Sequence, residues 1–406
     1  MRPLEEMAGQ LGLMDFFEKF LQKEPLIINK KVLQTNYIPD TIPHRQQQIE
    51  LLASILGPAL RGEKPSNIFV YGKPGVGKTM CVQYVLKTLE QAAAAKNTNL
   101  KPIYINCKLK KIADTEYRIV TELARAVGVE VPSTGLPTDE VYNRFLTAID
   151  SKPQIVILTL DEVDRLVLKA GDEILYNLTR INPELKQAQV SIVGISNDIR
   201  FIEQIDPRVK SSLGEEEAIF PPYNAVELKD ILEKRALLAF RPGALAEGVL
   251  EKAAAFAARE HGDARRALDL LRVAGEVAER ESAEKVLPEH IDKAEQRIEK
   301  DRVMDIIGTQ PKQSQLVLQA ILQITNGKKI ETGEIYEKYK ELCIQTGQAP
   351  LTQRRVSDLI GELDMLGLIT AKVISKGRYG RTREVYVAIS NELLEKIKAK
   401  LQEELF

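Results

Sequence analysis

Apolar runs alternate with stretches of helical periodicity over about the first 220 residues. Strands separated by helical segments predict parallel βαβ units. One run, IVILTL, is apolar at nearly every position, as is typical of a strand in a sheet covered on both faces. This part of the chain is therefore predicted to be an α/β domain. Its strand-like runs span residues 66–72, 101–107, 154–162 and 189–198.

The pattern changes after the paired prolines Pro221 and Pro222. From Glu227 to about Lys300 the chain is rich in Ala, Leu, Glu, Arg and Lys and contains no strand-like run, which predicts a small helical bundle. From Asp301 onward, three helical segments precede two strand-like pieces. Three helices followed by a hairpin is the element order of a winged helix-turn-helix. The predicted domains are 1–220, 221–300 and 301–406, and the hairpin strands are 369–375 and 384–390.

Composition changes this picture little. The 57 basic residues balance the 58 acidic residues, so a signal for nucleic acid must be local. We find no run of about 18 apolar residues, which predicts no membrane partner. The cysteines form no CxxC pair and suit a reducing interior, so a cytoplasmic location is expected.

A glycine-rich motif, GKPGVGKT, matches G-x-x-x-x-G-K-[ST] between a strand-like run and a helical segment, which is the context of a phosphate-binding loop (P-loop). Its glycines let backbone N–H groups face a phosphate. Lys78 is expected to reach the β- and γ-phosphates and the Thr79 hydroxyl to ligate Mg²⁺. The predicted ligands are ATP or ADP with Mg²⁺. The predicted nucleotide contacts here are Gly72, Pro74, Gly75, Val76, Gly77, Lys78, Thr79 and Met80.

Two adjacent acids, Asp161 and Glu162, end the run 154–162. A P-loop needs a second carboxylate for its metal, so we expect Asp161 to hold Mg²⁺ and Glu162 to act as general base on the attacking water. Asn197 ends the run 189–198. An asparagine there can bond a phosphate or the attacking water, but by itself it is more typical of a turn.

The motifs GKPGVGKT, LDEVD, GISND, DPRVKSSLGEEEAIFPPY and REHGDARRALDLLR occur in this order. Together they resemble the AAA+ ATPases of the archaeal origin-recognition family (Orc/Cdc-six type), which are DNA replication initiators. The resemblance covers nearly the whole chain after about residue 30. It implies an α/β P-loop AAA+ ATPase core with an N-terminal extension in 1–220, a helical lid in 221–300 and an α+β winged-helix DNA-binding domain in 301–406.

The resemblance also implies roles for residues of the ATPase. Asn197 would be sensor 1, and Arg265 of the lid would be sensor 2 and would touch the phosphates. Arg266 is expected on a solvated face. The positions expected to border the nucleotide are Tyr223, Arg235 and, in YIPDTIPHR, Arg45.

An arginine finger for a neighbour's ATP is expected in PRVKSSL, with Arg208 as the candidate. Some relatives carry a second arginine where this chain has Ser212. A salt-bridged structural Arg208 is the alternative. We therefore expect a weak ATPase in which slow hydrolysis acts as a switch.

The helical segment TQRRVSDLIGELDMLGL carries the DNA-reading candidates. Its predicted core face is Val356, Leu359, Ile360, Leu363 and Leu366, and Thr352 is the predicted cap. The first turns of a recognition helix face base edges, where Arg can bond guanine and Gln adenine. A solvated polar face is the alternative for this helix, and a solubilising hairpin for SKGRYGRTRE. The DNA-binding candidates are Gln353, Arg354 and Arg355 of the helix and Lys376, Arg378, Tyr379, Gly380, Arg381 and Arg383 of the wing.

The resemblance also places a DNA-contacting insertion at 108–120, with Arg118 as the candidate and a solvated helix as the alternative. The predicted function is an ATP-regulated protein that binds and distorts origin duplex and initiates chromosomal replication. Its expected partners are double-stranded origin DNA, the replicative (MCM) helicase and paralogous initiator subunits. The alternative is an ATP-gated winged-helix transcriptional regulator.

Overall fold

A computed structural model describes residues 24–35, 37–39, 41–108, 115–132, 135–325, 329–375, 381–387 and 391–405 of the chain. The chain forms two compact units, Met1–Ile291 and Asp292–Phe406. The first unit holds a parallel sheet and a helical lid, and the second holds helices and a small antiparallel sheet.

Among the described residues of the first unit, five strands form one parallel sheet in the order β2-β3-β4-β1-β5. This order brings the ends of β1, β3 and β4 together at one edge, because parallel strands share a direction. The strands are β1 (Ile68–Gly72), β2 (Leu100–Asn106), β3 (Ile155–Asp161), β4 (Gln189–Ser196) and β5 (Glu216–Phe220).

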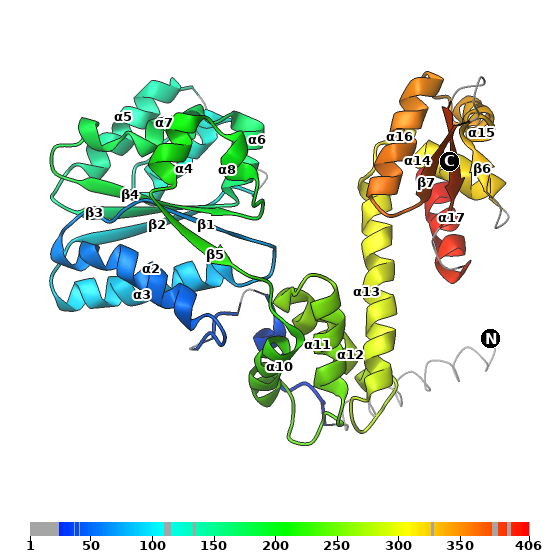
Figure 1. Cartoon of the computed structure of the whole chain (residues 1–406), viewed down its shortest axis with the longest axis horizontal. Helices are drawn as coiled ribbons and strands as arrows, with labels where there is room; N and C mark the ends of the chain where they lie inside the picture. The colour runs from blue at the N-terminus through cyan, green and yellow to red at the C-terminus, as the bar shows by residue number, and fades with distance from the viewer. Residues whose placement is uncertain are drawn as a thin grey trace, which may run out of the picture. The chain divides into compact units, whose positions relative to one another are not determined.

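Helices cover both faces of this sheet (Figure 1). Alternate side chains of β3 enter different cores: Val156, Leu158 and Leu160 pack on one side, and Ile155 and Ile157 on the other. The first core is shared with α4 (Glu116–Ala126), α5 (Thr138–Ile149), α6 (Val163–Ala170), α7 (Glu173–Thr179), α8 (Phe201–Gln204) and α9 (Pro207–Leu213). The second is shared with α2 (Gln46–Leu56), η2 (Gly57–Arg61) and α3 (Lys78–Ala95).

The lid begins directly after β5 and the two prolines. Its first helix has a capping box, in which the Asn224 side chain accepts from backbone N–H groups and Glu227 bonds back to the Asn224 N–H. The short η1 (Lys30–Leu33), in the N-terminal segment of the chain, packs on α10 and α12. The lid helices are α10 (Ala225–Ala239), α11 (Val249–Arg259) and α12 (Ala264–Arg280), and α13 (Pro288–Thr309) runs across the division between the two units.

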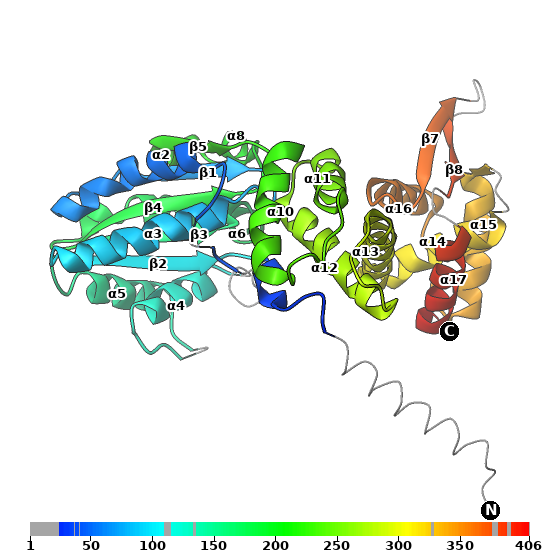
Figure 2. The ribbon, with the colours of Figure 1, turned by 90° about the horizontal axis from the view of Figure 1, so that it is seen from below.

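The second unit contains the predicted three helices and hairpin, and Figure 2 shows β7 and β8 side by side. Its elements are α14 (Lys312–Ile324), β6 (Ile330–Glu331), α15 (Thr332–Gln345), α16 (Gln353–Met365), β7 (Thr370–Ser375), β8 (Arg381–Tyr386) and α17 (Asn391–Leu405). In the described part of this unit the sheet order is β6-β8-β7, with antiparallel pairing. Val356, Leu359, Ile360 and Leu363 of α16 are buried as predicted.

Several elements differ from the sequence prediction. Leu366 was expected in the core but is 38% exposed, because α16 ends at Met365 and its last turn leaves the core. The second hairpin strand begins at Arg381 rather than at residue 384. The strands β5 and β6 and the helix α17 were not predicted from the apolar pattern. The proposed bound at residue 300 falls inside α13, and the three domain ranges stay a prediction. Among the described residues, no helix is both long and apolar enough to span a bilayer.

Candidate nucleotide-binding and DNA-binding sites

The P-loop joins β1 to α3, and α3 begins at Lys78. Gly75 and Gly77 have φ values of +72° and +92°, a left-handed conformation in which an L side chain would be strained. Pro74 is exposed at the loop surface, and Val76 is fully buried. The loop therefore has the backbone that the motif predicts, and it opens directly into the N-terminus of an 18-residue helix.

Lys78 is almost fully buried and folds back over the loop. Its ammonium donates to the carbonyl oxygens of Gly72 at 2.7 Å and Lys73 at 2.8 Å, and to Asn197 Oδ1 at 2.9 Å. Burial lowers the pKa of Lys78 to about 8. The bond to Asn197 brings the tips of β1 and β4 together, so the asparagine from the end of the fourth strand lies at the P-loop, as expected for sensor 1.

Asp161 is the last residue of β3 and Glu162 follows it, at the same edge of the sheet. Asp161 Oδ2 accepts from the Thr79 hydroxyl at 2.8 Å and from the Tyr104 hydroxyl at 2.6 Å, while Oδ1 accepts from the Glu162 N–H. Glu162 has a left-handed backbone, with φ 55° and ψ 47°, and its carboxylate lies 3.5 Å from Lys108 Nζ. A buried carboxylate beside a threonine hydroxyl is a set of hard oxygen donors, which suits Mg²⁺.

Tyr104 was missed by the sequence reasoning. Burial, followed by its bond to Asp161, raises the pKa of its phenol. Tyr104 lies two residues before the end of β2, which pairs with β3 so that Asn106 stands beside Asp161. The available signal was a tyrosine between the buried Ile103 and Ile105, in a strand predicted to end beside the acidic pair.

The loop before α12 brings the lid to the P-loop. The Asp263 carboxylate caps α12 by accepting from the Arg265 N–H at 2.7 Å, and the Ala264 N–H donates to the Gly75 carbonyl at 3.2 Å. A Cβ built on Gly75 would lie 1.6 Å from Asp263 Oδ1, so glycine is needed for this approach. Arg265 lines the same cavity as Lys78, as predicted for a lid residue that faces phosphates.

Arg266 differs from its predicted solvated position. Its side chain is 13% exposed and its Nε lies 3.0 Å from a carboxylate oxygen of Glu260. The two arginines that begin α12 thus point to different places. Arg265 lies in the cavity with Thr79, Asp161 and Asn197, whereas Arg266 stabilises the lid itself.

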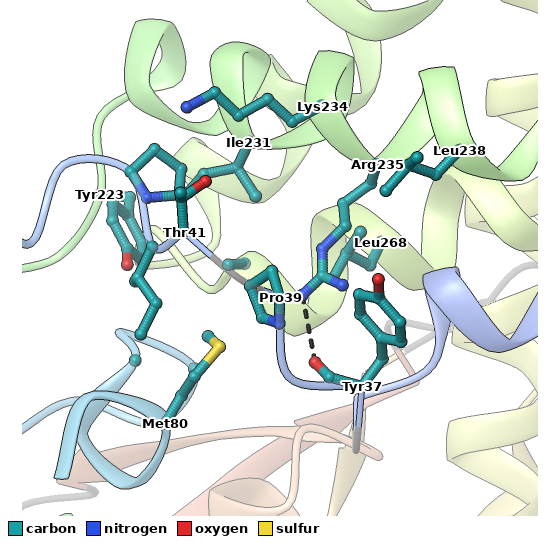
Figure 3. Close-up of a pocket in the computed structure, with 15 residues that line it drawn as sticks. Tyr37, Pro39, Thr41, Met80, Tyr223, Ile231, Lys234, Arg235, Leu238 and Leu268 are labelled. Carbon is teal, nitrogen blue, oxygen red and sulfur yellow. Dashed lines mark hydrogen bonds between the residues drawn. The ribbon is translucent and has the colours of Figure 1, made fainter. Parts of the chain in front are cut away.

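An apolar pocket adjoins the P-loop, between the N-terminal segment, α3 and the lid (Figure 3). Arg235 closes one side of the pocket. Its guanidinium donates to the carbonyl oxygens of Tyr37 at 3.2 Å and Val32 at 3.3 Å and packs over the Tyr37 ring. The apolar and aromatic residues that line the pocket are Pro39, Ile42, Pro43, Met80, Tyr223, Ile231, Leu238 and Leu268.

Arg45 was expected to border the nucleotide but lies behind the P-loop. Its buried guanidinium donates to the carbonyl oxygens of Val76 at 2.9 Å, Pro221 at 2.6 Å and His44 at 3.1 Å. The guanidinium carbon is 3.7 Å from the centroid of the Tyr223 ring. Arg45 therefore joins the P-loop to the segment that leads into the lid.

Arg208 adopts the salt-bridged arrangement that the sequence left open. Its guanidinium bonds both carboxylate oxygens of Asp206, with the shortest contact at 2.7 Å, and packs over the Tyr176 ring. The bonds from Arg208 lower the pKa of Asp206 to about 2. The pair is on the surface, with 63% of the Arg208 side chain exposed. Nothing in the described chain tests a role toward a neighbour's ATP.

The first turn of α16 presents exposed Gln353, Arg354 and Arg355, and the Thr352 hydroxyl caps the helix by accepting from the Arg355 N–H. Arg355 also lies 3.3 Å from Glu362 on the same helix. The exposed face predicted for base reading is therefore present.

The wing candidates are only partly described. Lys376, Arg378, Tyr379 and Gly380 lie outside the described residues, as does the side chain of Arg381, whose backbone belongs to β8. Arg383 does not point to solvent as expected of a phosphate contact, because its NH1 donates to the Ser357 carbonyl of α16 at 2.8 Å. In the predicted insertion, residues 109–114 lie outside the described chain, and Arg118 is an exposed residue of α4.

Comparison with known proteins identifies each part of the chain. Residues 61–202 match the model of an AAA domain, residues 229–296 that of a Cdc6 AAA+ ATPase-type lid domain, and residues 305–397 that of a CDC6 C-terminal winged helix domain. The ORC1-type DNA replication protein of Pyrococcus furiosus is 53% identical over 394 residues, which cover 96% of this chain and 93% of that protein. ORC1-type DNA replication protein 1 of Methanosarcina mazei is 52% identical, with 96% and 94% covered.

Among solved structures, the Aeropyrum pernix ORC1 protein in complex with DNA matches with a TM-score of 0.84 and 48% identity, covering 95% of this chain and all of that one. Cdc6p from Pyrobaculum aerophilum shares the fold, with a TM-score of 0.58 at 23% identity. The predicted AAA+ core, lid and winged helix are thus confirmed. The chain belongs to the Orc1/Cdc6 family of AAA+ DNA replication initiators.

Proposed function

We propose that the chain binds ATP between its AAA+ core and lid, and that the bound nucleotide regulates how it binds origin duplex. The observation that carries the nucleotide site is the convergence of Lys78, Asp161, Asn197 and Arg265 on one cavity. These residues come from four separate segments. Lys78 bonds Asn197, and Asp161 bonds the next P-loop residue, Thr79. A triphosphate needs cations, N–H donors and a metal-binding carboxylate in one place, and this cavity offers all of them.

The polar cavity at the P-loop would hold the phosphates, and the apolar pocket beside it would hold the base. The phosphates replace the carbonyl oxygens that Lys78 contacts at Gly72 and Lys73, and the helix N-terminus and loop N–H groups receive them. The adenine enters the apolar pocket of Figure 3, between Met80 and the ring of Tyr223. Arg235 acts by holding the backbone of residue 37 at the pocket rather than by contacting the base.

Thr79 and Asp161 would hold Mg²⁺, which neutralises phosphate charge. Glu162 serves as general base on the attacking water. Lys108 Nζ lies 3.5 Å from the Glu162 carboxylate. This ion pair stabilises the carboxylate and so makes it a weaker base toward the attacking water. Arg208 pairs with Asp206, so acting on a neighbour's ATP would first require this surface ion pair to break. Both contacts support slow hydrolysis that acts as a switch.

The position of the lid would depend on whether phosphates occupy the P-loop. The Asp263 carboxylate packs against Gly75, and the Ala264 N–H donates to the Gly75 carbonyl. Phosphates that bind at the P-loop would therefore be repelled by the negative charge of Asp263. Arg265 supplies the opposite charge two residues further along the chain. Exchange of the Asp263 contact for an Arg265 contact gives the lid two positions, set by the nucleotide.

For DNA, the proposed contacts are Gln353, Arg354 and Arg355 in the major groove and the wing along the phosphates. The exposure of the three α16 side chains supports this, as does the likeness to an ORC1 protein solved with DNA. Arg118 is proposed as a further phosphate contact. Recruitment of the replicative helicase, assembly with paralogous initiator subunits and a cytoplasmic, nucleoid-associated location belong to the same proposal.

Two variants test the nucleotide site. Lys78→Ala removes the ammonium and should abolish ATP binding, whereas Glu162→Gln keeps the shape of the base and should bind ATP but not hydrolyse it. Binding is followed with a fluorescent ATP analogue and hydrolysis by phosphate release. Normal hydrolysis by both variants would disprove the proposed site, and turnover as fast as that of a motor would disprove the switch.

Chromosomal occupancy tests the DNA function. Crosslinking and sequencing of bound fragments should place the protein at replication origins. Occupancy of promoters without origins would instead favour the transcriptional regulator.

A further inference from the structure

Arg383 of β8 crosses from the wing to the recognition helix. Its NH1 donates to the backbone carbonyl of Ser357 at 2.8 Å, in the second turn of α16. A helical carbonyl has a second lone pair that can accept such a bond without breaking the helix. The donor is a permanently charged guanidinium, and hydrogen bonds from charged donors are stronger than neutral ones.

Gly361 provides the space for this contact. A Cβ built there would lie 2.8 Å from NH1 of Arg383, which is closer than real Cβ contacts. Ser357 and Gly361 are one turn apart on the same side of α16, so the guanidinium lies along the helix backbone. Glycine lowers helix stability by about 1 kcal/mol relative to alanine. Its presence in the interior of α16 is therefore explained by the arginine that it admits.

Two further bonds fix the hairpin, one to α16 and one to α15. The Ala371 N–H, in the first hairpin strand, donates to Asp364 Oδ1 at 3.1 Å near the end of α16. The Arg383 N–H donates to the Thr332 hydroxyl at 3.3 Å, which fixes β8 to the start of α15. The hairpin is thus attached to α16 twice. The first strand, β7, is bonded to Asp364, and the second strand, β8, is bonded to Ser357 through Arg383.

We propose that Arg383 is a positioning residue that sets the angle between the recognition helix and the wing, with Gly361 as its receptor. The inference rests on the proposed DNA-binding function of this unit. A helix in one groove and a hairpin beside it can both reach DNA only at a restricted mutual angle. Without the Arg383 contact the wing can adopt several orientations. If about one in ten of these lets the helix and the wing bind DNA together, the apparent affinity falls about tenfold when the contact is lost.

The experiment uses the full-length chain and two duplexes: the chromosomal site of highest occupancy and a scrambled duplex of the same composition. Arg383→Gln and Gly361→Ala should each weaken binding to the first duplex about tenfold, with less effect on the second. Gly361→Ala removes no charge, so its slope of log K against log salt should equal that of the wild type. Arg383→Gln should also keep the slope, because the guanidinium faces the helix rather than a phosphate.

The double variant should bind no more weakly than the weaker single variant, since both changes break one contact. Gly333→Ala in α15 is the matched control, because a Cβ there meets nothing within 4 Å. Arg118→Gln, exposed on α4 and proposed above as a phosphate contact, provides a contrast that should make the slope shallower by about 0.9. Thermal melting confirms that each variant is folded.

Three results would overturn the inference. If the slope of log K against log salt became shallower by about 0.9 in Arg383→Gln, this arginine would be a phosphate contact. Wild-type affinity in a folded Gly361→Ala would remove the receptor, and additive losses in the double variant would separate the two residues. If Gly361→Ala does not fold, the slope of Arg383→Gln decides alone. Failure of the wild type to prefer its own site would instead count against the proposed DNA function.

Discussion

Replacing Arg45 by methionine tests how the P-loop is joined to the lid. Methionine keeps most of the length and apolar contact of the side chain and removes its donors. The carbonyl oxygens of Val76 and Pro221, which accept at 2.9 and 2.6 Å, then lose a partner inside the protein. The stacking on the Tyr223 ring is weakened in the same change.

The magnitude follows from these contacts. A buried acceptor left without a donor costs about 1–3 kcal/mol, and two such carbonyls are freed. Part of this loss is offset because the buried charge of Arg45 is held by backbone carbonyl oxygens, and methionine has no charge to desolvate. We expect a loss of about 2–4 kcal/mol in the free energy of unfolding. At about 2–4 °C per kcal/mol, the melting temperature of the first unit falls by roughly 4–16 °C.

Differential scanning calorimetry with and without ATP identifies the relevant transition, since ligand binding raises the melting temperature of the unit that binds it. ATP affinity is measured on the same samples and should fall with stability. Arg61→Met is the matched control, because Arg61 is 69% exposed and pairs with Glu63 on the surface. A variant that melts within about 2 °C of the wild type and binds ATP normally would refute the joining role of Arg45.

Three further changes test other contacts of the site. Tyr104→Phe removes a hydroxyl that competes for the metal-facing carboxylate, so the Mg²⁺ concentration needed for half-maximal nucleotide binding should fall roughly threefold; a rise would contradict the competition. Gly75→Ala places a side chain against the cap of α12 and should weaken ATP binding at least about tenfold, whereas Gly62→Ala, with a similar φ of +76° but open space, should bind normally; equal effects would mean that backbone strain alone decides. In Arg208→Ala, the carboxyl of Asp206 should titrate near its ordinary pKa rather than near 2, as followed by NMR. Because that pKa is lowered in the folded state, the stability from the pair is present above the ordinary pKa and is lost as pH falls toward 2, so melting temperatures of variant and wild type should converge there.

The sequence predicted those elements that a local pattern determines. The P-loop glycines, the acids after β3 and the core face of α16 follow from motif and periodicity. The strand β5 could not be found in this way, because it starts with two exposed acids, leaves Ile219 exposed and buries only Ala218 and Phe220. It is a strand because β1 supplies its hydrogen-bonding partner.

Contacts between distant segments were harder to predict. Arg45 lies 31 residues from Val76 and 176 from Pro221, so no local pattern joins them. Arg383 was predicted to face DNA because its neighbours are basic, but its direction depends on the alternation of side chains along β8 and on a glycine in α16. Such contacts depend on tertiary packing, which composition and periodicity do not record.

The left-handed backbone of Glu162 has a consequence for the protein as a whole. An L residue other than glycine gives up roughly 1–2 kcal/mol in this conformation, and glutamate lacks the short polar side chain that lets asparagine tolerate it. With the proposed role of Glu162 as general base, the chain would trade thermodynamic stability for chemistry at this position. The most heat-resistant sequence for this fold and the most active one would then differ at residue 162, and selection for thermal stability alone would remove the glutamate.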